Sequence, residues 1–195
     1  SIRLGGLSMA ALRRRRPFLE PRPVWLVLCE GRVTERQYLR AWRSRSKAVL
    51  AVESCSGGAL TMVRQGIRRK REARDSFDRV WCVTDADHLP AEQLREASLL
   101  ASRGRVELLI SNPCFELWAL LHFEVCQAHL TVDEACRRLR THLPGYDKKL
   151  PFDLLASGYS VAAERARKLD PSGEGLNPST TVYRLTEALR ESGPL

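Results

Sequence analysis

Hydrophobic and polar positions along the chain predict an alternation of strands and helices up to about residue 112. Short apolar runs, of the kind that a parallel sheet buries on both faces, occupy 24–30, 48–55, 79–85 and 106–110. Apolar residues at helical spacing lie between these runs, at 34–45, 60–75 and 91–102. Strands that alternate with helices are typical of an α/β fold, so we expect about four strands in a mostly parallel sheet flanked by helices.

The pattern changes after residue 112, where no further strand is predicted. Asn112 is a good helix N-cap and Pro113 suits the first helical position, so a helix is expected to begin there. Helices are expected near 113–123, 131–141, 151–157, 160–169 and 179–191. We therefore divide the chain into a basic tail at 1–21, an α/β core at 22–112 and a helical extension at 113–195 that completes the same domain.

Length and hydropathy agree with a soluble protein. A chain of 195 residues suits one domain with a proper core. No apolar run approaches the roughly 20 residues of a membrane span, and the first residues lack the apolar stretch of a signal peptide. We expect a cytoplasmic location, and the sequence leaves open whether the chain forms homo-oligomers.

Positive charge is concentrated in two places. The net charge is +9, and the first 16 residues hold five arginines and no acid, which leaves +4 for the rest. The predicted helix at 60–75 carries a second basic group: Arg64, Arg68, Arg69, Lys70, Arg71 and Arg74. Such residues often line a solvated helix face. They could equally neutralise the phosphates of a nucleic acid, which gives affinity without sequence preference.

The six cysteines give no sign of a metal site or a disulfide framework. They form no CxxC pair and have no histidine partner at zinc spacing. Several lie in the predicted strands, where a free thiol packs as a small hydrophobic group. We therefore expect reduced, structural cysteines.

Carboxylates follow two of the predicted strands at the points where the strands end. Glu30 follows the first strand, and Asp85 and Asp87 end the third. The carboxyl ends of parallel strands share one edge of a sheet, so these side chains should meet. Carboxylates this close repel one another unless a cation lies among them, and Mg²⁺ prefers such oxygen ligands. An extended strand would point the two aspartates to opposite sides, so both can bind one ion only if the chain turns at Ala86.

A further acid lies near the same edge. Glu116 falls in the first turn of the apolar helix predicted at 113–123. The helix dipole alone favours a glutamate there, while its place beside the strand ends suggests a further metal ligand. His122, later in this helix, is expected to be a packed core histidine.

Five stretches carry a family resemblance: CEGRVTE, VWCVTDAD, ISNPCFELWALLHF, LPGYDKK and NPSTTVYRL. Together they resemble the RloB family, which is found beside restriction and antiphage loci and is related to the Toprim catalytic domain. The resemblance covers about residues 22–191, and NPCFELW is its most specific part. It implies a Toprim-like, Rossmann-type core.

The resemblance also implies roles for the acids. Glu30 matches the Toprim glutamate, which acts as general acid/base or as a metal ligand, and Asp85 and Asp87 match the magnesium-binding pair. Glu35 falls near a second acid of related nucleases, and Glu116 near an acid that helps to hold a second metal. Two Mg²⁺ or Mn²⁺ ions roughly 3.5–4 Å apart would then clamp the attacking and leaving oxygens of a phosphodiester.

The implied activity is that of a nuclease that hydrolyses DNA or RNA, such as tRNA, as the effector of an antiphage or abortive-infection system. Lys148 or Lys149, in GYDKK, resembles the basic residue that faces the scissile phosphate, although both could be ordinary exposed loop lysines. Neighbouring genes of the family often encode an ATPase, so an ATPase partner is expected. The chain itself has no GxxxxGK[ST] phosphate-binding loop.

Two other classes of function stay open. A nucleotidyl transferase would use the same metal site, but it needs a triphosphate pocket, and the Gly-rich candidate is the short Ser56-Gly57-Gly58. A non-catalytic Toprim module that binds nucleic acid or a partner gains nothing from carboxylates opposite phosphates. A topoisomerase would need a tyrosine nucleophile, and no sequence context marks Tyr38, Tyr146, Tyr159 or Tyr183 as one.

Overall fold

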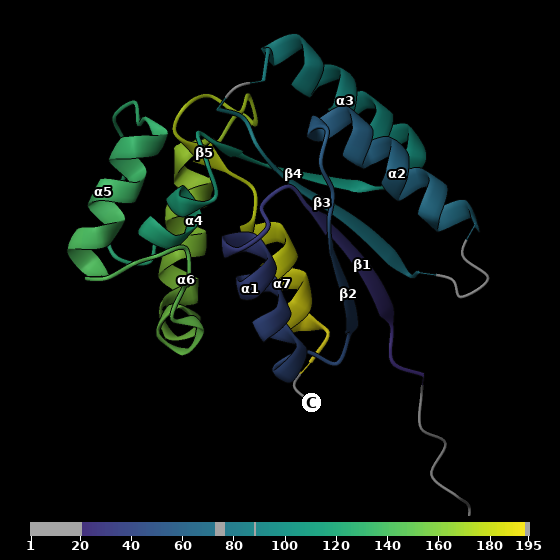
Figure 1. Cartoon of the computed structure of the whole chain (residues 1–195), viewed down its shortest axis with the longest axis horizontal. Coiled ribbons are helices and arrows are strands. Elements are labelled where there is room, and N and C mark those ends of the chain that lie inside the picture. The colour runs from purple at the N-terminus through teal and green to yellow at the C-terminus, as the bar shows by residue number, and fades with distance from the viewer. Residues whose placement is uncertain (1–20, 73–76, 88, 194–195) are drawn as a thin grey trace, which may run out of the picture.

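The chain folds around one central sheet with helices on both faces (Figure 1), as seen in a computed structural model that describes residues 21–72, 77–87 and 89–193. Within these residues the strands are β1 (Val24–Cys29), β2 (Val49–Ser54), β3 (Arg79–Asp85), β4 (Glu107–Asn112) and β5 (Ser179–Thr180). They lie in the order β2-β1-β3-β4-β5. The first four run parallel and β5 runs antiparallel to β4. The predicted α/β class with a mostly parallel sheet is therefore confirmed.

Helices cover the two faces of the sheet unequally. They are α1 (Thr34–Ala41) with the short 3-10 helix η1 (Trp42–Ser44), α2 (Gly58–Glu72), α3 (Ala91–Gly104), α4 (Glu116–Leu120), α5 (Val132–His142), α6 (Phe152–Leu169) and α7 (Tyr183–Glu191). The helices α2 and α3 pack on one face, where Leu26 and Leu28 of β1 point. Trp25 and Val27 point to the other face, into a larger core that α1, α4, α6 and α7 complete. This alternation along β1 is what a strand buried on both faces requires.

The helix α4 lies in the middle of the larger core. Its Leu117, Trp118 and Leu120 have no exposed surface, as the apolar sequence on all sides of this segment predicts. The indole nitrogen of Trp118 donates a 3.0 Å hydrogen bond to the hydroxyl of Tyr38 on α1. This contact satisfies two buried polar groups and ties α4 to α1.

The predicted start of the helix at residue 113 is wrong. Asn112 is the last residue of β4, where it pairs with Ser179 of β5, and the Asn112-Pro113 peptide bond is cis. The helix α4 begins only at Glu116. Asn112 is therefore a strand residue instead of an N-cap, because β5 extends the sheet beside it.

Two more helix predictions need correction. The helices expected at 151–157 and 160–169 are one continuous α6, because Gly158 is accommodated within the helix and Leu155, Tyr159 and Ala162 form one buried stripe across it. The helix expected at 179–191 begins at Tyr183, after the two residues of β5. A strand of two residues has no periodicity by which a sequence could reveal it.

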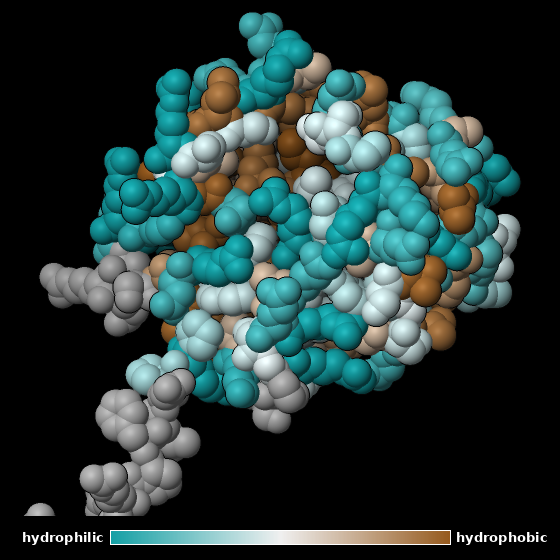
Figure 2. Space-filling view, turned by 180° about the vertical axis from the view of Figure 1, so that it is seen from behind, coloured by the Kyte–Doolittle hydropathy of each residue, from teal (hydrophilic) through white to brown (hydrophobic). Residues whose placement is uncertain are grey.

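Other features of the described residues agree with the sequence. All six cysteines are free and buried, as expected. None of the described helices combines the length and the apolar character that a membrane crossing requires. Figure 2 shows the reverse side of the molecule, where hydrophobic side chains gather in a hollow bordered by hydrophilic ones. The arginine-rich tail and Arg74 lie outside the described residues.

Candidate active site

The ends of β1 and β3 bring two of the predicted acids to the same edge of the sheet. Glu30 directly follows β1, and its backbone N–H donates a 3.1 Å hydrogen bond to the carbonyl of Val83 on β3. The hydroxyl of Thr84 donates a 2.7 Å hydrogen bond to Glu30 Oε2. Asp85, the next residue, ends β3. The parallel pairing of β1 with β3 thus fixes Glu30 close to Asp85.

The chain turns immediately after Asp85. The Ala86 N–H still donates to the carbonyl of Ser111 on β4 at 2.9 Å, and the Leu89 N–H then donates back to the Ala86 carbonyl at 3.1 Å. Asp87 lies in this turn and is exposed. The turn near Ala86 that two aspartates facing one site would need is therefore present.

Glu35 reaches the same edge from α1. Its side chain is buried, and its carboxylate lies directly over Gly31. A Cβ atom at residue 31 would come within 1.6–2.2 Å of the atoms of that carboxylate. Glycine at residue 31 therefore leaves the room that the Glu35 carboxylate occupies, and a larger residue would displace that carboxylate.

Glu116 enters from α4 and is held by the loop that follows α5. The Tyr146 hydroxyl and Lys148 Nζ both contact Glu116 Oε1, at 2.9 Å and 2.6 Å. The hydroxyls of Tyr146 and Thr34 lie 3.3 Å apart, which links this loop to the start of α1. Lys148 has a left-handed backbone, with φ at 73°, and its side chain is half exposed.

The structure separates the two candidate lysines. Lys148 joins the site through its ion pair with Glu116. Lys149 is exposed on the loop. Lys149 therefore fits the interpretation as an ordinary exposed loop lysine, whereas Lys148 is the lysine that lies beside the acids.

The five acids form one electrostatically coupled group, which we call the acidic cluster: Glu30, Glu35, Asp85, Asp87 and Glu116. Burial is the main reason why the pKa of Asp85 is raised to about 8. The charges of the other four acids raise it further. Asp85 is therefore the member of the cluster that burial and repulsion affect most.

Two other members of the cluster shift in opposite directions. Burial, and then the charges of Glu116 and Glu30, raise the pKa of Glu35. Burial alone would also raise the pKa of Glu116, but the hydrogen bonds from Lys148 and Tyr146 and the charge of Lys148 lower it overall. Glu35 can thus hold a proton under conditions in which Glu116 is ionised.

The chemistry of the acidic cluster fits a hard divalent cation such as Mg²⁺ or Mn²⁺. Its donors are all carboxylate oxygens, and Asp85 Oδ1 is buried without a hydrogen-bond partner. Within the described residues, however, no three His, Cys, Asp or Glu side chains converge as a ready-made metal group. Thr84 holds Glu30, and Tyr146 and Lys148 hold Glu116. A cation would require these carboxylates to turn toward a common point.

The basic residues of α2 are not gathered at the acidic cluster. Arg69 forms two hydrogen bonds with the Glu53 carboxylate, at 2.6 Å and 2.9 Å, and Lys70 donates to the carbonyl of Arg105 at 2.5 Å. Arg64, Arg68 and Arg71 are exposed. Because α2 runs away from the strand ends (Figure 1), these arginines lie between its middle and its far end.

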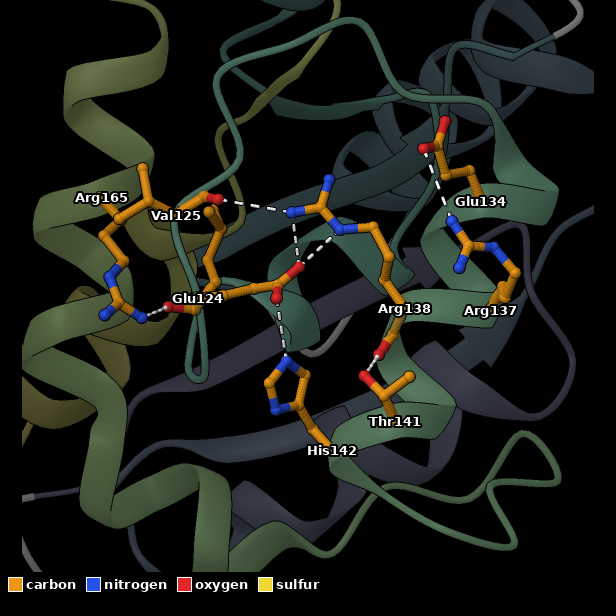
Figure 3. A network of polar contacts seen from close by, with 9 residues as sticks. Glu124, Val125, Glu134, Arg137, Arg138, Thr141, His142 and Arg165 are labelled. Carbon is orange, nitrogen blue, oxygen red and sulfur yellow. Dashed lines mark hydrogen bonds and ion pairs between the residues drawn. The ribbon is translucent and has the colours of Figure 1, made fainter.

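A second polar network fixes α5 against the end of α4 (Figure 3). Arg138 Nε donates to Glu124 Oε1 at 2.5 Å, and His142 Nε2 lies 3.0 Å from Glu124 Oε2. From α6, Arg165 donates to the Leu121 carbonyl at 2.7 Å. The loop with Tyr146 and Lys148 follows α5 directly, so this network supports the part of the chain that holds Glu116.

Three residues of the site were not predicted from the sequence: Thr34, Thr84 and Tyr146. Thr84 directly precedes Asp85, and Tyr146 lies two residues before Lys148. Their closeness in sequence to candidate residues was the only feature of the sequence that could have pointed to Thr84 and Tyr146. Their hydrogen bonds join segments far apart in the chain, which spacing alone does not reveal.

Comparison with known proteins identifies a matching family. The family model for RloB-like protein matches residues 25–189. No curated protein and no solved structure matches the chain.

Proposed function

This chain belongs to the RloB-like protein family, and from that premise we propose that it is a metal-dependent nuclease with a Toprim-like catalytic core. Its substrate is DNA or RNA, and its role is that of an antiphage effector controlled by an ATPase partner. The observation that carries the proposal is the acidic cluster, which draws carboxylates from three separate parts of the chain toward one sheet edge and sets Lys148 beside them.

Buried carboxylates that repel one another destabilise a fold, so their gathering calls for a compensating ligand. One lysine, itself half exposed, offsets only part of this negative charge. A divalent cation held by Glu30, Asp85 and Asp87, with a second near Glu35 and Glu116, would complete the compensation. Such ions supply Lewis acidity and lower the pKa of a bound water.

The side chains of the site would have different roles in the proposed reaction. In the metal-free protein the pKa of Glu35 is raised, and a cation beside it would lower that pKa and favour the carboxylate form that binds the ion. Lys148 places positive charge where negative charge develops on the phosphate. Tyr146 holds Glu116 in position through its hydrogen bond to Oε1, and Thr34 in turn contacts the Tyr146 hydroxyl. Thr84 does the same for Glu30.

The decisive experiment measures cleavage of plasmid DNA and of total tRNA by the purified full chain with Mg²⁺, Mn²⁺ or EDTA. We expect cleavage with either metal, none in EDTA, and none for the Asp85→Ala/Asp87→Ala variant. The matched control is Glu92→Ala/Glu96→Ala, which removes two exposed acids from α3.

Cleavage that persists in EDTA, or that the Asp85→Ala/Asp87→Ala variant retains, would contradict the proposal. If the wild-type chain alone cleaves neither substrate, the assay is repeated with the product of the neighbouring gene, the proposed ATPase partner. Continued inactivity in that mixture would also reject the nuclease.

A further inference from the structure

A hollow of about 480 Å³ opens between α2, from its middle onward, and the C-terminal half of α3, away from the acidic cluster. Four arginines line it, Arg64, Arg68, Arg71 and Arg103, against the single acid Glu72. The rest of its lining is aliphatic. The hollow therefore combines a positive rim with an apolar surface.

Helix geometry explains how the arginines are gathered. Arg64, Arg68 and Arg71 are four and three residues apart, so they share one face of α2. Arg103 comes from the last turn of α3, which packs against α2. A basic residue in the last turn of a helix suits the helix dipole, but that effect accounts for one charge at a helix end and not for a four-arginine rim.

Most of this positive charge is not neutralised by the residues that the structure describes. Arg68 pairs with Glu72 at 3.7 Å, and both side chains are about two-thirds exposed. Arg64, Arg71 and Arg103 form no ion pair with any residue that the structure describes. Arg69 and Lys70, by contrast, are engaged by the rest of the fold. The basic residues of α2 thus divide into structural ones and ones that face the hollow.

We propose that this arginine hollow binds the phosphate backbone of a nucleic acid at a point remote from the acidic cluster. Arginine forks match phosphate oxygens in pairs, and the aliphatic lining fits the sugar edge between phosphates. The acidic cluster, if it serves a nuclease as proposed above, already requires a substrate that carries phosphates. A nucleic acid is therefore a better occupant than an acidic protein segment, and the inference rests on the proposed function in this one step.

The position of the hollow sets a minimum length for the substrate. The helix α2 begins at Gly58, directly after β2 and so at the same edge of the sheet as the acids. Arg68 lies ten residues further along, which is about 15 Å of helix. That distance corresponds to about four to five base pairs of a duplex. The substrate is accordingly a polymer and not a mononucleotide.

The test is the salt dependence of binding, measured by fluorescence anisotropy in EDTA so that no cleavage occurs. The full chain is titrated with a labelled 20-base-pair DNA duplex over a range of salt concentrations. In the Arg64→Gln/Arg71→Gln/Arg103→Gln variant, we expect the slope of log K against log [salt] to fall by about 2.7, since each lost phosphate contact removes about 0.9. Binding at fixed low salt should weaken by about tenfold or more.

The matched control is Arg95→Gln/Arg137→Gln/Arg140→Gln, which removes the same charge from exposed positions outside the hollow. An equal loss of slope in both variants, or none in the hollow variant, overturns the inference. Displacement of the duplex by polyglutamate of equal charge, at equal concentration, also overturns it, because the hollow would then fit an acidic protein.

The arginine hollow and the nuclease activity can each be rejected without the other. A wild-type chain that cleaves nucleic acid, with an unchanged salt slope in the hollow variant, rejects the hollow alone. A chain that shows the hollow-dependent slope but never cleaves, even with the product of the neighbouring gene, rejects the nuclease and keeps the hollow as a binding site.

Discussion

The hydroxyl of Tyr146 donates a 2.9 Å hydrogen bond to Glu116 Oε1, an oxygen buried at the start of α4. The same hydroxyl lies 3.3 Å from Thr34 Oγ1 at the start of α1. Two helices that supply acids to the site are therefore linked through one tyrosine. This tyrosine positions Glu116, and it makes its contact from a loop that follows α5.

Removal of that hydroxyl should leave Glu116 less firmly positioned, while the aromatic ring still fills its place in the core. In the Tyr146→Phe variant we expect a loss of about 1 kcal/mol in the free energy of unfolding, typical of one hydrogen bond. Cleavage should fall by about tenfold, while substrate binding in EDTA stays unchanged. The measurements are urea denaturation and initial rates with Mg²⁺. Tyr183→Phe is the control, and equal rates for the two variants would refute the positioning role.

The ion pair between Lys148 and Glu116 predicts different behaviour for two adjacent lysines. In Lys148→Ala, Glu116 stays buried without its cation, so we expect a stability loss of about 1 kcal/mol near pH 7, discounted because Lys148 is half exposed. The pKa of Glu116 is lowered in the folded protein. The stabilisation is thus present above the ordinary pKa of 4.5 and is lost as the pH falls below it.

The matched control for this change is Lys149→Ala. The removal of charge from an exposed loop residue should leave both stability and cleavage within error, whereas Lys148→Ala should lose cleavage by about a hundredfold. Rate measurements on both variants at pH 7.5 and chemical denaturation at pH 7 and pH 3.5 make the comparison. Similar losses in the two variants would mean that the site does not use Lys148.

The sequence was sufficient for the four parallel strands and for the approximate location of the acids, because both follow from local signals. Buried apolar runs mark the strands, and parallel strands share one carboxyl edge, so Glu30 and Asp85 could be placed together. The contacts that organise these acids are not local. Tyr146 reaches Glu116 across 30 residues, and Thr84 reaches Glu30 across 54. No periodicity encodes such pairs.

The parts that the sequence missed have similar physical reasons. The strand β5 is two residues long, and its pairing with β4 depends on tertiary packing. The helices expected at 151–157 and 160–169 are one, because a buried stripe on both sides of Gly158 holds α6 together. Which of Lys148 and Lys149 faces Glu116 depends on the loop backbone, which is left-handed at Lys148. Two adjacent lysines look alike in the sequence, so the sequence does not distinguish them.

Asp85 should destabilise the metal-free protein at alkaline pH. Its pKa is raised by burial and by its acidic neighbours from 3.8 to about 8. The folded state therefore binds a proton that the unfolded state has lost, and stability falls as the pH rises from about 4 to about 8. In EDTA at pH 9, Asp85→Asn should be more stable than the wild type by a few kcal/mol in order of magnitude. At pH 4 the difference should vanish.

Divalent cations should reverse that order. We expect Mg²⁺ to raise the melting temperature of the wild-type protein at pH 8 and to leave Asp85→Asn nearly unchanged, because the cation replaces the missing positive charge. Thermal denaturation with EDTA or Mg²⁺ tests both statements. Asp153→Asn, at a side chain that is 86% exposed, is the control. A wild-type protein that shows no response to Mg²⁺ or Mn²⁺ would argue against a metal at the cluster.

His122 should act as a neutral core residue that makes the fold sensitive to acid. Burial, aided by the charge of Arg165, lowers its pKa from 6.5 to about 4. One ring nitrogen lies 2.9 Å from the Trp118 carbonyl, and the ring packs edge-on against the Trp118 indole. Between these two pH values His122 is protonated in the unfolded chain but stays neutral in the folded protein. Stability therefore falls as the pH drops from about 6.5 to about 4.

The test is to compare His122→Phe with the wild type across this range. The variant should lose the acid sensitivity, so its stability relative to the wild type should improve by about 2 kcal/mol between pH 7 and pH 4.5. Denaturation curves at several pH values give the difference. His129→Gln, at an exposed position, should follow the wild-type profile. An identical pH profile for His122→Phe would show that His122 does not carry the effect.

Substitution of Gly31 should reduce cleavage activity much more than it reduces stability. A methyl group at this position would overlap the carboxylate of Glu35, whose atoms lie 1.6–2.2 Å from the new Cβ. The carboxylate is the flexible end of a side chain, so it can move away, and the cost in stability should be about 1 kcal/mol or a little more. The displaced Glu35 would no longer share the acidic cluster, and cleavage should fall by about a hundredfold.

The comparison that isolates this effect is Gly158→Ala. A Cβ at residue 158 meets His122 at 3.7 Å, an ordinary contact, within the helix α6. Alanine favours a helix over glycine by about 0.5–1 kcal/mol, so this variant should be slightly more stable and fully active. Stability and initial rates measured on both variants separate the two outcomes. A fully active Gly31→Ala protein would show that Glu35 is dispensable where the structure holds it, and its role in the cluster would then be rejected.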